Sequence, residues 1–310
     1  MGFWIDQGHH ARIEGRRLAM ACFLVLVAWV PPAAQAEDGA LGEALLAEVN
    51  ARRLEAGVES LELHPALTTV ARRQVRAVSV RGETGSDPDI VPDTTRLLYK
   101  EGYAAHRWSE GTLIVGSAGT LLEQWQQVSP DFHRQMTEGD FENVGLAFGR
   151  YRGRPVVTMV LALTMRTAEW RQAKPLENLE RVRALALETV NAVRIEQGRT
   201  PIRQNSQLDL AAQRHAEDML RRAYYDHISP EGDRPSDRAR AAEYARARSI
   251  SENIAKGPFE PDEVVHRWMN SSGHRRNILR RGVTEMGFGV AFGENENGFE
   301  ILWVQLFGAR

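Results

Sequence analysis

Apolar residues recur every three or four positions through much of the second half of the chain, a spacing typical of amphipathic helices. One helix is predicted to begin near Leu179 and to stop at Gly198. The apolar stripe of the next helix includes His215, where we expect a structural core histidine. Near the C-terminus, residues 288–292 and 299–307 are predicted as two strands around an ENENG turn. Helices followed by an antiparallel hairpin predict an α+β fold.

The segment SSGHRRNIL, residues 271–279, places a lone histidine between a glycine and two arginines. If the segment is helical, His274 points the same way as Ile278, whereas Arg275 and Arg276 point towards water. The imidazole is therefore expected to face inward. An inward histidine is either a satisfied core residue or part of a functional site.

The two halves of the chain repeat one pattern in the same order. EVNARRLEAGVESLELHPALTTVARRQV, from Glu48, aligns with TVNAVRIEQGRTPIRQNSQLDLAAQRHA, from Thr189, and EQWQQVSPDFHRQM aligns with HRWMNSSGHRRNIL. NVGLAFGRYRGRPVVTMVLAL aligns with GFGVAFGENENGFEILWVQLF. These matches predict a duplication, with residues 37–168 and 179–310 as domains and 169–178 as the linker.

The first residues differ from the rest, because three arginines precede the apolar run LAMACFLVLVAWV, which PPAAQA then ends. This run is short for a membrane span, and residues 34–36 fit a small-x-small cleavage site. We expect a signal peptide over residues 1–36 and secretion to the periplasm or beyond, with no stable membrane span after cleavage. An uncleaved membrane anchor is the alternative.

Cysteine content and charge narrow the possible functions. The only cysteine, Cys22, lies in the predicted signal peptide, so the mature chain has no disulfide, thiol nucleophile or thiolate ligand. The formal net charge is -2 at pH 7, without the basic excess of a nucleic-acid-binding protein.

Four segments of the second half place ionisable side chains where a core would not favour them. They are YDHISPEGDRP with His227, ISENIAKGP with Glu252, SSGHRRNIL with His274 and TEMGFGVAFG with Glu285. Each alone has common structural uses, such as a loop histidine or a polar residue at a strand start.

Taken together, HAEDML, HISPEG, SENIAKG, WMNSSGHRRNIL, EMGFGVAFG and WVQLFG strongly resemble the CAP superfamily (cysteine-rich secretory proteins, antigen 5 and pathogenesis-related proteins) in its bacterial SCP-like form. The resemblance covers residues 179–308 and implies an α-β-α sandwich with a central antiparallel sheet that carries a wide cleft. It also implies that the cleft is lined by a tetrad of His227, Glu252, His274 and Glu285.

The sequence departs from the family pattern in several places. Glu243 stands in RARAAEY where the family usually has glycine. In the first half no histidine aligns with His227, Phe141 falls where Glu285 would be, and only Glu110 matches Glu252. We therefore interpret the first half as a degenerate CAP-like copy without a working tetrad.

Two imidazoles and two carboxylates suit a divalent cation such as zinc, with His227 and His274 as ligands. Without metal, the four side chains would form a hydrogen-bonded network. We favour a secreted binding module for a lipid or cell-envelope glycan. A metal-dependent hydrolase, most simply a protease with Glu252 or Glu285 as base, is an alternative. A third hypothesis is a structural adaptor that binds an envelope protein.

Overall fold

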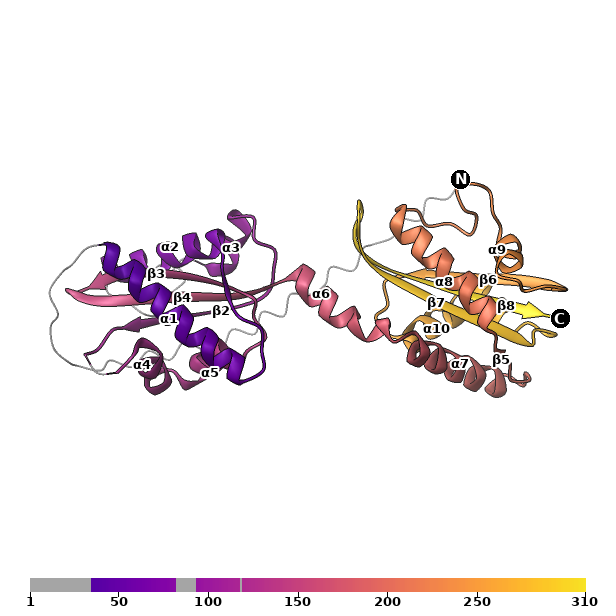
Figure 1. The fold of residues 1–310 in the computed structure, drawn as a ribbon, viewed down its shortest axis with the longest axis horizontal. Coiled ribbons are helices and arrows are strands. Elements are labelled where there is room, and N and C mark those ends of the chain that lie inside the picture. Colours follow the sequence, from indigo (N-terminus) through magenta and orange to yellow (C-terminus); the bar gives the residue numbers. More distant parts are fainter. Residues whose placement is uncertain (1–34, 82–92, 118) are drawn as a thin grey trace. The chain divides into compact units, whose positions relative to one another are not determined.

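The computed structural model describes residues 35–81, 93–117 and 119–310, so almost all of the predicted signal peptide lies outside the described residues. Within these ranges no helix has both the length and the apolar character needed to cross a membrane. The described residues form two compact units, unit 1 up to residue 168 and unit 2 over residues 169–310 (Figure 1).

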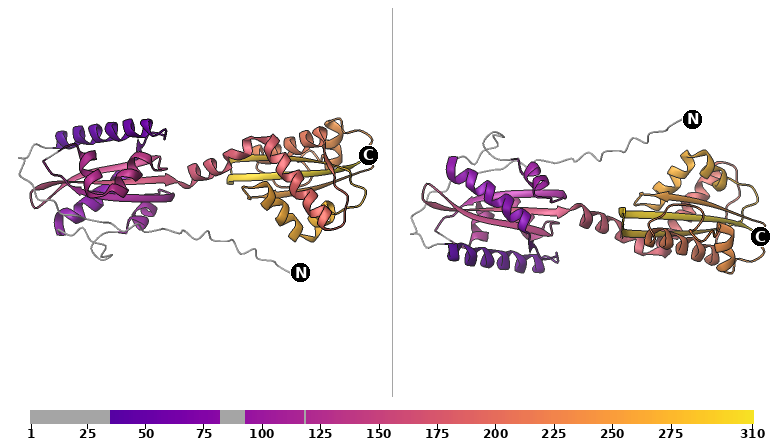
Figure 2. Two further views of the ribbon diagram at one scale, coloured as in Figure 1. Left: turned by 90° about the horizontal axis from the view of Figure 1, so that it is seen from below. Right: turned by 90° about the horizontal axis from the view of Figure 1, so that it is seen from above.

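Unit 1 is a four-stranded sheet with helices packed on both faces (Figure 2). One hydrophobic core lies under α1, α4 and α5, and the other lies under α2 and α3. The elements are α1 (Gln35–Glu55), β1 (Glu62–Leu63), α2 (Pro65–Arg81), α3 (Thr94–Lys100), β2 (Ala105–Ile114), α4 (Leu121–Val128), α5 (Pro130–Glu138), β3 (Asn143–Tyr151) and β4 (Arg154–Thr164).

Unit 2 has the same three layers. One core lies between the sheet and α7, α10 and α11, and the other lies under α8 and α9. Its elements are α7 (Leu179–Glu196), β5 (Arg203–Gln204), α8 (Ser206–Arg221), α9 (Pro235–Ala241), β6 (Ser249–Lys256), α10 (Pro261–Asn270), α11 (Ser272–Ile278), β7 (Glu285–Asn295) and β8 (Gly298–Ala309). The predicted C-terminal hairpin is therefore confirmed as β7 and β8. Between β4 and α7, the chain forms α6 (Met165–Ala173) and the 3-10 helix η1 (Lys174–Glu177), where the sequence predicts a linker.

The strands follow the same order in both sheets, β1-β3-β4-β2 in unit 1 and β5-β7-β8-β6 in unit 2. The long strands pair antiparallel, but β1 pairs parallel with β3 and β5 parallel with β7. The α+β class is confirmed, whereas each sheet is mixed instead of purely antiparallel. The parallel strands have two residues each, too few to show an alternating pattern in the sequence. That unit 1 is a degenerate copy of unit 2 stays a prediction.

Glycines bring one helix of each unit directly onto the sheet. A Cβ on Gly287 of β7 would lie 2.1 Å from the backbone of Leu208 in α8. A Cβ on Gly145 of β3 would lie equally close, at 2.1 Å, to the backbone of Leu67 in α2. Only hydrogen fits at these two contacts, so both helices can pack against the backbone of the strand beneath.

Candidate functional site

The centre of the candidate site is Glu252 on β6, an edge strand, whose side chain is nevertheless only 1% exposed. One of its carboxylate oxygens, Oε1, lies 2.8 Å from Nδ1 of His227. The other, Oε2, accepts a 2.7 Å hydrogen bond from Arg238 of α9. Arg238 also donates to the backbone carbonyl of His227 at 3.0 Å. Both oxygens of the buried carboxylate thus meet nitrogen donors, which offsets the cost of its burial.

His227 is the exposed member of this cluster, with 48% of its side chain accessible. Its hydrogen bond with Glu252 raises the pKa of His227 and outweighs the opposite effect of partial burial. A proton on Nδ1 that points to the carboxylate leaves Nε2 as the nitrogen with a free lone pair. When neutral, this imidazole is therefore oriented to bind a cation or to accept a proton through Nε2.

His215 lies behind Glu252, and its side chain is 1% exposed. Its Nε2 lies 3.0 Å from the backbone carbonyl of Asp226 and 3.9 Å from Oε1 of Glu252. Burial lowers the pKa of His215, which favours the neutral form of the ring. The histidine that the sequence assigns to the core is indeed buried there, although it also contacts the polar cluster.

His274 is half-buried on α11, whereas Arg275 and Arg276 are exposed, as the helical spacing predicts. Burial lowers the pKa of His274, and the charge of His227 lowers it further. The two imidazoles therefore lie within electrostatic range of one another.

Amide side chains fix α11 against the edge strand that carries Glu252. Asn277 donates to the backbone carbonyl of Glu252 at 2.9 Å and to Oδ1 of Asn253 at 2.8 Å. Asn253, which is fully buried, donates in turn to the carbonyl of His274 at 3.3 Å and to Gln305 at 3.0 Å. These hydrogen bonds keep the backbone at His274 close to β6.

Glu285, the fourth predicted residue, has a separate set of partners at the start of β7. Its carboxylate accepts hydrogen bonds from Tyr244 at 2.6 Å and Asn205 at 3.2 Å. Arg203 and Arg310 lie 3.3 and 3.5 Å away. Burial raises its pKa, but these donors and cations outweigh burial, and the pKa of Glu285 is lowered. In the described part of the chain, no hydrogen bond or ion pair joins Glu285 to the other three predicted residues.

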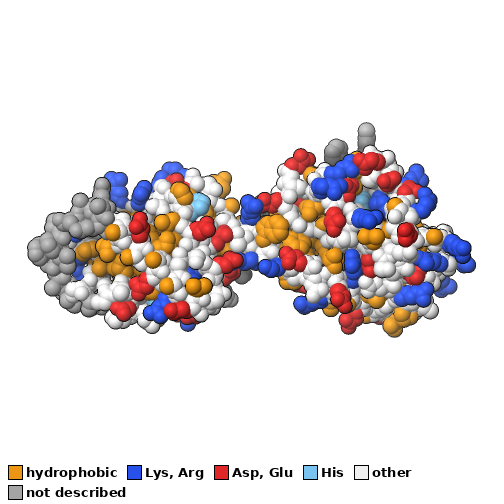
Figure 3. Space-filling model, in the orientation of Figure 1, with side chains coloured by type: hydrophobic (Ala, Val, Ile, Leu, Met, Phe, Trp, Pro, Cys, Tyr) orange, Lys and Arg blue, Asp and Glu red, His pale blue; other side chains and the backbone are white. Residues whose placement is uncertain are grey.

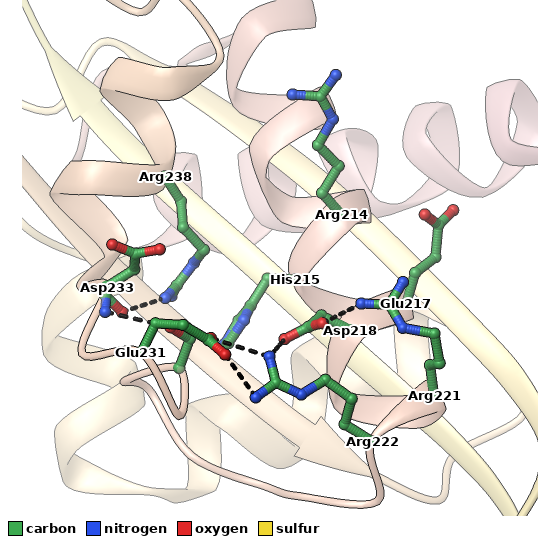
Figure 4. Close-up of a pocket in the computed structure, with 10 residues that line it drawn as sticks. Arg214, His215, Glu217, Asp218, Arg221, Arg222, Glu231, Asp233 and Arg238 are labelled. Carbon is green, nitrogen blue, oxygen red and sulfur yellow. Dashed lines mark hydrogen bonds and ion pairs between the residues drawn. The ribbon is translucent and has the colours of Figure 1, made fainter.

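A cavity of about 350 Å³ shares His215 and Arg238 with this cluster. Figure 4 shows paired charges along it, where Arg222 binds Glu231 and Asp218. The Nε of Arg238 is buried without a hydrogen-bond partner among the described residues. The cavity is polar, and most of its charges neutralise one another.

Arg238 is a residue of the candidate site that the sequence does not predict. The available signal was an arginine among alanines in the short segment PSDRARA, directly after HISPEGDRP. Its side chain is only 11% exposed, and no spacing rule shows that an arginine on so short a helix reaches the edge strand. Arginine on a short helix is usually solvated, so the pairing with Glu252 becomes visible only in the fold.

Unit 1 also keeps a glutamate on its edge strand β2. Glu110 accepts hydrogen bonds from the hydroxyl of Thr94 and, at 3.2 Å, from the amide of Gln74. Burial is the largest effect on the pKa of Glu110 and raises it. The carboxyl group is thus held by neutral donors, where Glu252 in unit 2 has an arginine and a histidine.

Within the described residues, no group of three or more histidine, cysteine, aspartate or glutamate side chains is arranged to hold a metal ion. As metal ligands, His227 and His274 would supply one ring nitrogen each. Glu252 is occupied by hydrogen bonds and would orient His227 instead of binding a metal. A cation here would need oxygen ligands from water or from a bound molecule.

Comparisons with known proteins place the family signal in unit 2. Residues 187–307 match the sequence model of the CAP, or cysteine-rich secretory protein, family. YkwD, an uncharacterized protein of Bacillus subtilis (strain 168), is 38% identical over 121 residues, which are 39% of this chain and 44% of YkwD. YlbC, an uncharacterized membrane protein of the same organism, is 29% identical over 104 residues, 34% of this chain and 30% of YlbC. The chain thus spans less than half of the length of either relative.

Among solved structures, an extracellular protein with an SCP domain from Bacillus anthracis str. Ames is 20% identical. The match covers 54% of this chain and 56% of that chain, with a TM-score of 0.39. The family match, together with the motifs it contains from the second helix to the last strand, identifies residues 187–307 of this chain as a CAP domain.

Proposed function

We propose that the protein is a secreted binding module whose CAP domain binds a lipid or a cell-envelope glycan at the surface around His227 and His274. The N-terminal apolar run supports export, and the family match supports a binding role. One observation carries the proposal. Glu252 is held between His227 and Arg238, which fixes the His227 ring and leaves its Nε2 free at the surface.

A divalent cation fits this arrangement as an accessory to ligand binding. The two histidines would supply nitrogen ligands, and Glu252 would hold the tautomer of His227 from behind, as carboxylates do behind metal-bound imidazoles. With two protein ligands, several coordination positions stay open for oxygen atoms of a ligand headgroup or sugar. The cation would then join the ligand to the protein.

Zinc titration by calorimetry tests the cation site. We expect binding that the double variant His227→Ala, His274→Ala abolishes, and that Glu252→Gln weakens about 10- to 100-fold because the ring loses its orienting partner. His266→Ala, which removes an exposed histidine of α10, is the matched control and should bind as wild type. Zinc affinity should fall on acidification from a higher pH than for an ordinary histidine, because the pKa of His227 is raised.

Equal zinc binding by wild type and the double variant would reject the cation site. The ligand itself is tested by extracting bound lipid from the purified protein and by pull-down on envelope glycan. Absence of both would reject the binding module.

A hydrolase remains the second candidate, because a carboxylate-oriented imidazole with a free Nε2 can act as a general base. We assign that role to His227 in this candidate, since both carboxylate oxygens of Glu252 and of Glu285 already meet donors. Hydrolysis that His227→Ala abolishes and Glu285→Gln leaves intact would support this candidate.

A further inference from the structure

Exposed arginines collect at one end of unit 2, where β5, β6 and β7 begin and β8 ends. Figure 3 shows Lys and Arg side chains at this end of the unit, among others on the same face; Figure 1 marks this end with the C-terminus. We call this surface the arginine end. It comprises the exposed Arg203, Arg248, Arg280, Arg281 and Arg310, with the partly exposed Arg199 beside them.

Backbone contacts bring these residues together from distant segments. The N–H of Arg248 donates to the carbonyl of Ala309 at 2.8 Å, beside Arg310. The side chain of Arg199 donates to the carbonyl of Leu279 at 3.0 Å, next to Arg280 and Arg281. The arginine end is therefore a property of the fold, not of one basic stretch of sequence.

Most of this positive charge is not neutralised. Arg203 and Arg310 share Glu285, but the other four arginines form no ion pair in the part of the chain that the structure describes. The exposed acidic residues closest in sequence are Glu196 and Glu243. Because guanidinium groups stay protonated at any physiological pH, the surface carries a net positive charge in a chain whose formal net charge is -2.

The corresponding end of unit 1 shows that the fold does not require this charge. Glu62 pairs with β3 in the register that Arg203 has with β7. The last residue of α5 is Glu138, and Asp140 follows it as an exposed side chain. Acidic residues thus stand in unit 1 at places where unit 2 has arginines, so the shared strand order alone does not account for the arginines.

An exposed aliphatic side chain accompanies the arginines. Ile195, in the last turn of α7, is 60% exposed. Within the same turn, the backbone N–H of Arg199 bonds to the carbonyl of Arg194 at 2.7 Å, so Ile195 and Arg199 are neighbours. Basic residues around an exposed aliphatic residue are typical of surfaces that meet anionic bilayers.

We propose that the arginine end docks the CAP domain on a bilayer that contains anionic phospholipids. The guanidinium groups would bind headgroup phosphates, for which their planar fork of donors is suited, and Ile195 would enter the boundary between headgroups and acyl chains. The arginine end does not include His227, Glu252 or His274, and its charge does not depend on a cation at His227.

Sedimentation of the full chain with vesicles tests the proposal. The vesicles contain 30% phosphatidylglycerol in phosphatidylcholine, and pure phosphatidylcholine is the reference. The double variant Arg280→Gln, Arg281→Gln should bind about 25-fold more weakly, since each surface arginine contributes about fivefold. Arg72→Gln, Arg76→Gln removes the same charge from exposed positions of α2 and should bind as wild type. Binding should also weaken as salt rises.

Ile195→Ser separates a bilayer from a soluble polyanion, because it keeps every charge. It should weaken vesicle binding and leave binding of soluble polyphosphate unchanged. Equal vesicle binding by wild type and the Arg280, Arg281 variant would overturn the proposal. So would a wild type that prefers polyphosphate to vesicles while Ile195→Ser has no effect, since the partner would then be a polymer.

Discussion

The two units differ most in the partners of the glutamate on the edge strand. They differ least in the buried side chains that hydrogen-bond to the backbone. Asn50 and Asn191 both bond their side-chain amides to a backbone segment, at Leu61 and Ile202 respectively. Arg53 and Arg194 are both 1% exposed and donate to carbonyls at the end of a short helix, α5 in unit 1 and α11 in unit 2. These two buried polar contacts are therefore the same in both units.

The glutamates on the two edge strands, in contrast, have different partners. Glu252 faces the cations Arg238 and His227, whereas Glu110 faces the neutral side chains of Thr94 and Gln74. The side chains around the edge-strand glutamate thus differ between the two units, while the strand order and the buried contacts of Asn50, Asn191, Arg53 and Arg194 are the same. Function resides in a few side chains placed on that framework.

The largest expected effect tests the shared framework. Gly287→Ala and Gly145→Ala should each destabilise their own unit by about 3 kcal/mol, because the added methyl group meets helix backbone that cannot move aside. Urea unfolding of the full chain, with hydrogen exchange to assign each transition, measures both. Gly273→Ala, where the nearest atom is a flexible arginine terminus 3.9 Å away, is the control and should cost nothing. A loss of stability in only one of the two variants would show that the two glycine contacts are not equivalent.

An intermediate effect tests the difference between the carboxylates. Glu252→Gln should cost about 3 kcal/mol at pH 7, because it leaves Arg238 largely buried without its counter-ion. Glu110→Gln should cost less than about 1 kcal/mol, because its partners are neutral and burial already disfavours the charged form. The same unfolding assay applies, with the exposed Glu188→Gln as control. Similar losses for both variants would mean that the cations do not distinguish the two sites.

Much of this architecture could be predicted from the sequence, because periodicity reports which face of an element is buried. The C-terminal hairpin and the inward direction of His274 follow from spacing alone. The two-residue parallel strands could not be predicted, since hydrogen bonding defines them and no pattern does.

The candidate site was harder to predict than the fold. Resemblance grouped Glu285 with His227 and Glu252. The structure gives Glu285 hydrogen bonds with Tyr244 and Asn205, and its place in a shared cleft stays a prediction. Arg238 was not predicted, because an arginine on a short helix is usually solvated and no spacing rule connects it to Glu252.

The smallest expected effect is a pH dependence that unit 1 lacks at the corresponding place, since Gln74 stands on α2 where His215 stands on α8. Burial lowers the pKa of His215 in the folded state, so the unfolded chain binds its proton first as pH falls below about 6.5. Unit 2 should therefore lose stability on acidification, with a slope of at most about 1.4 kcal/mol per pH unit from this residue. His274 acts in the same direction and His227 in the opposite one, so the test is a difference. His215→Gln should make the unfolding free energy of unit 2 less dependent on pH between 7 and 5. An unchanged slope would mean that this ring gains a proton in the folded protein as easily as in the unfolded chain, and that its burial beside Glu252 carries no electrostatic cost.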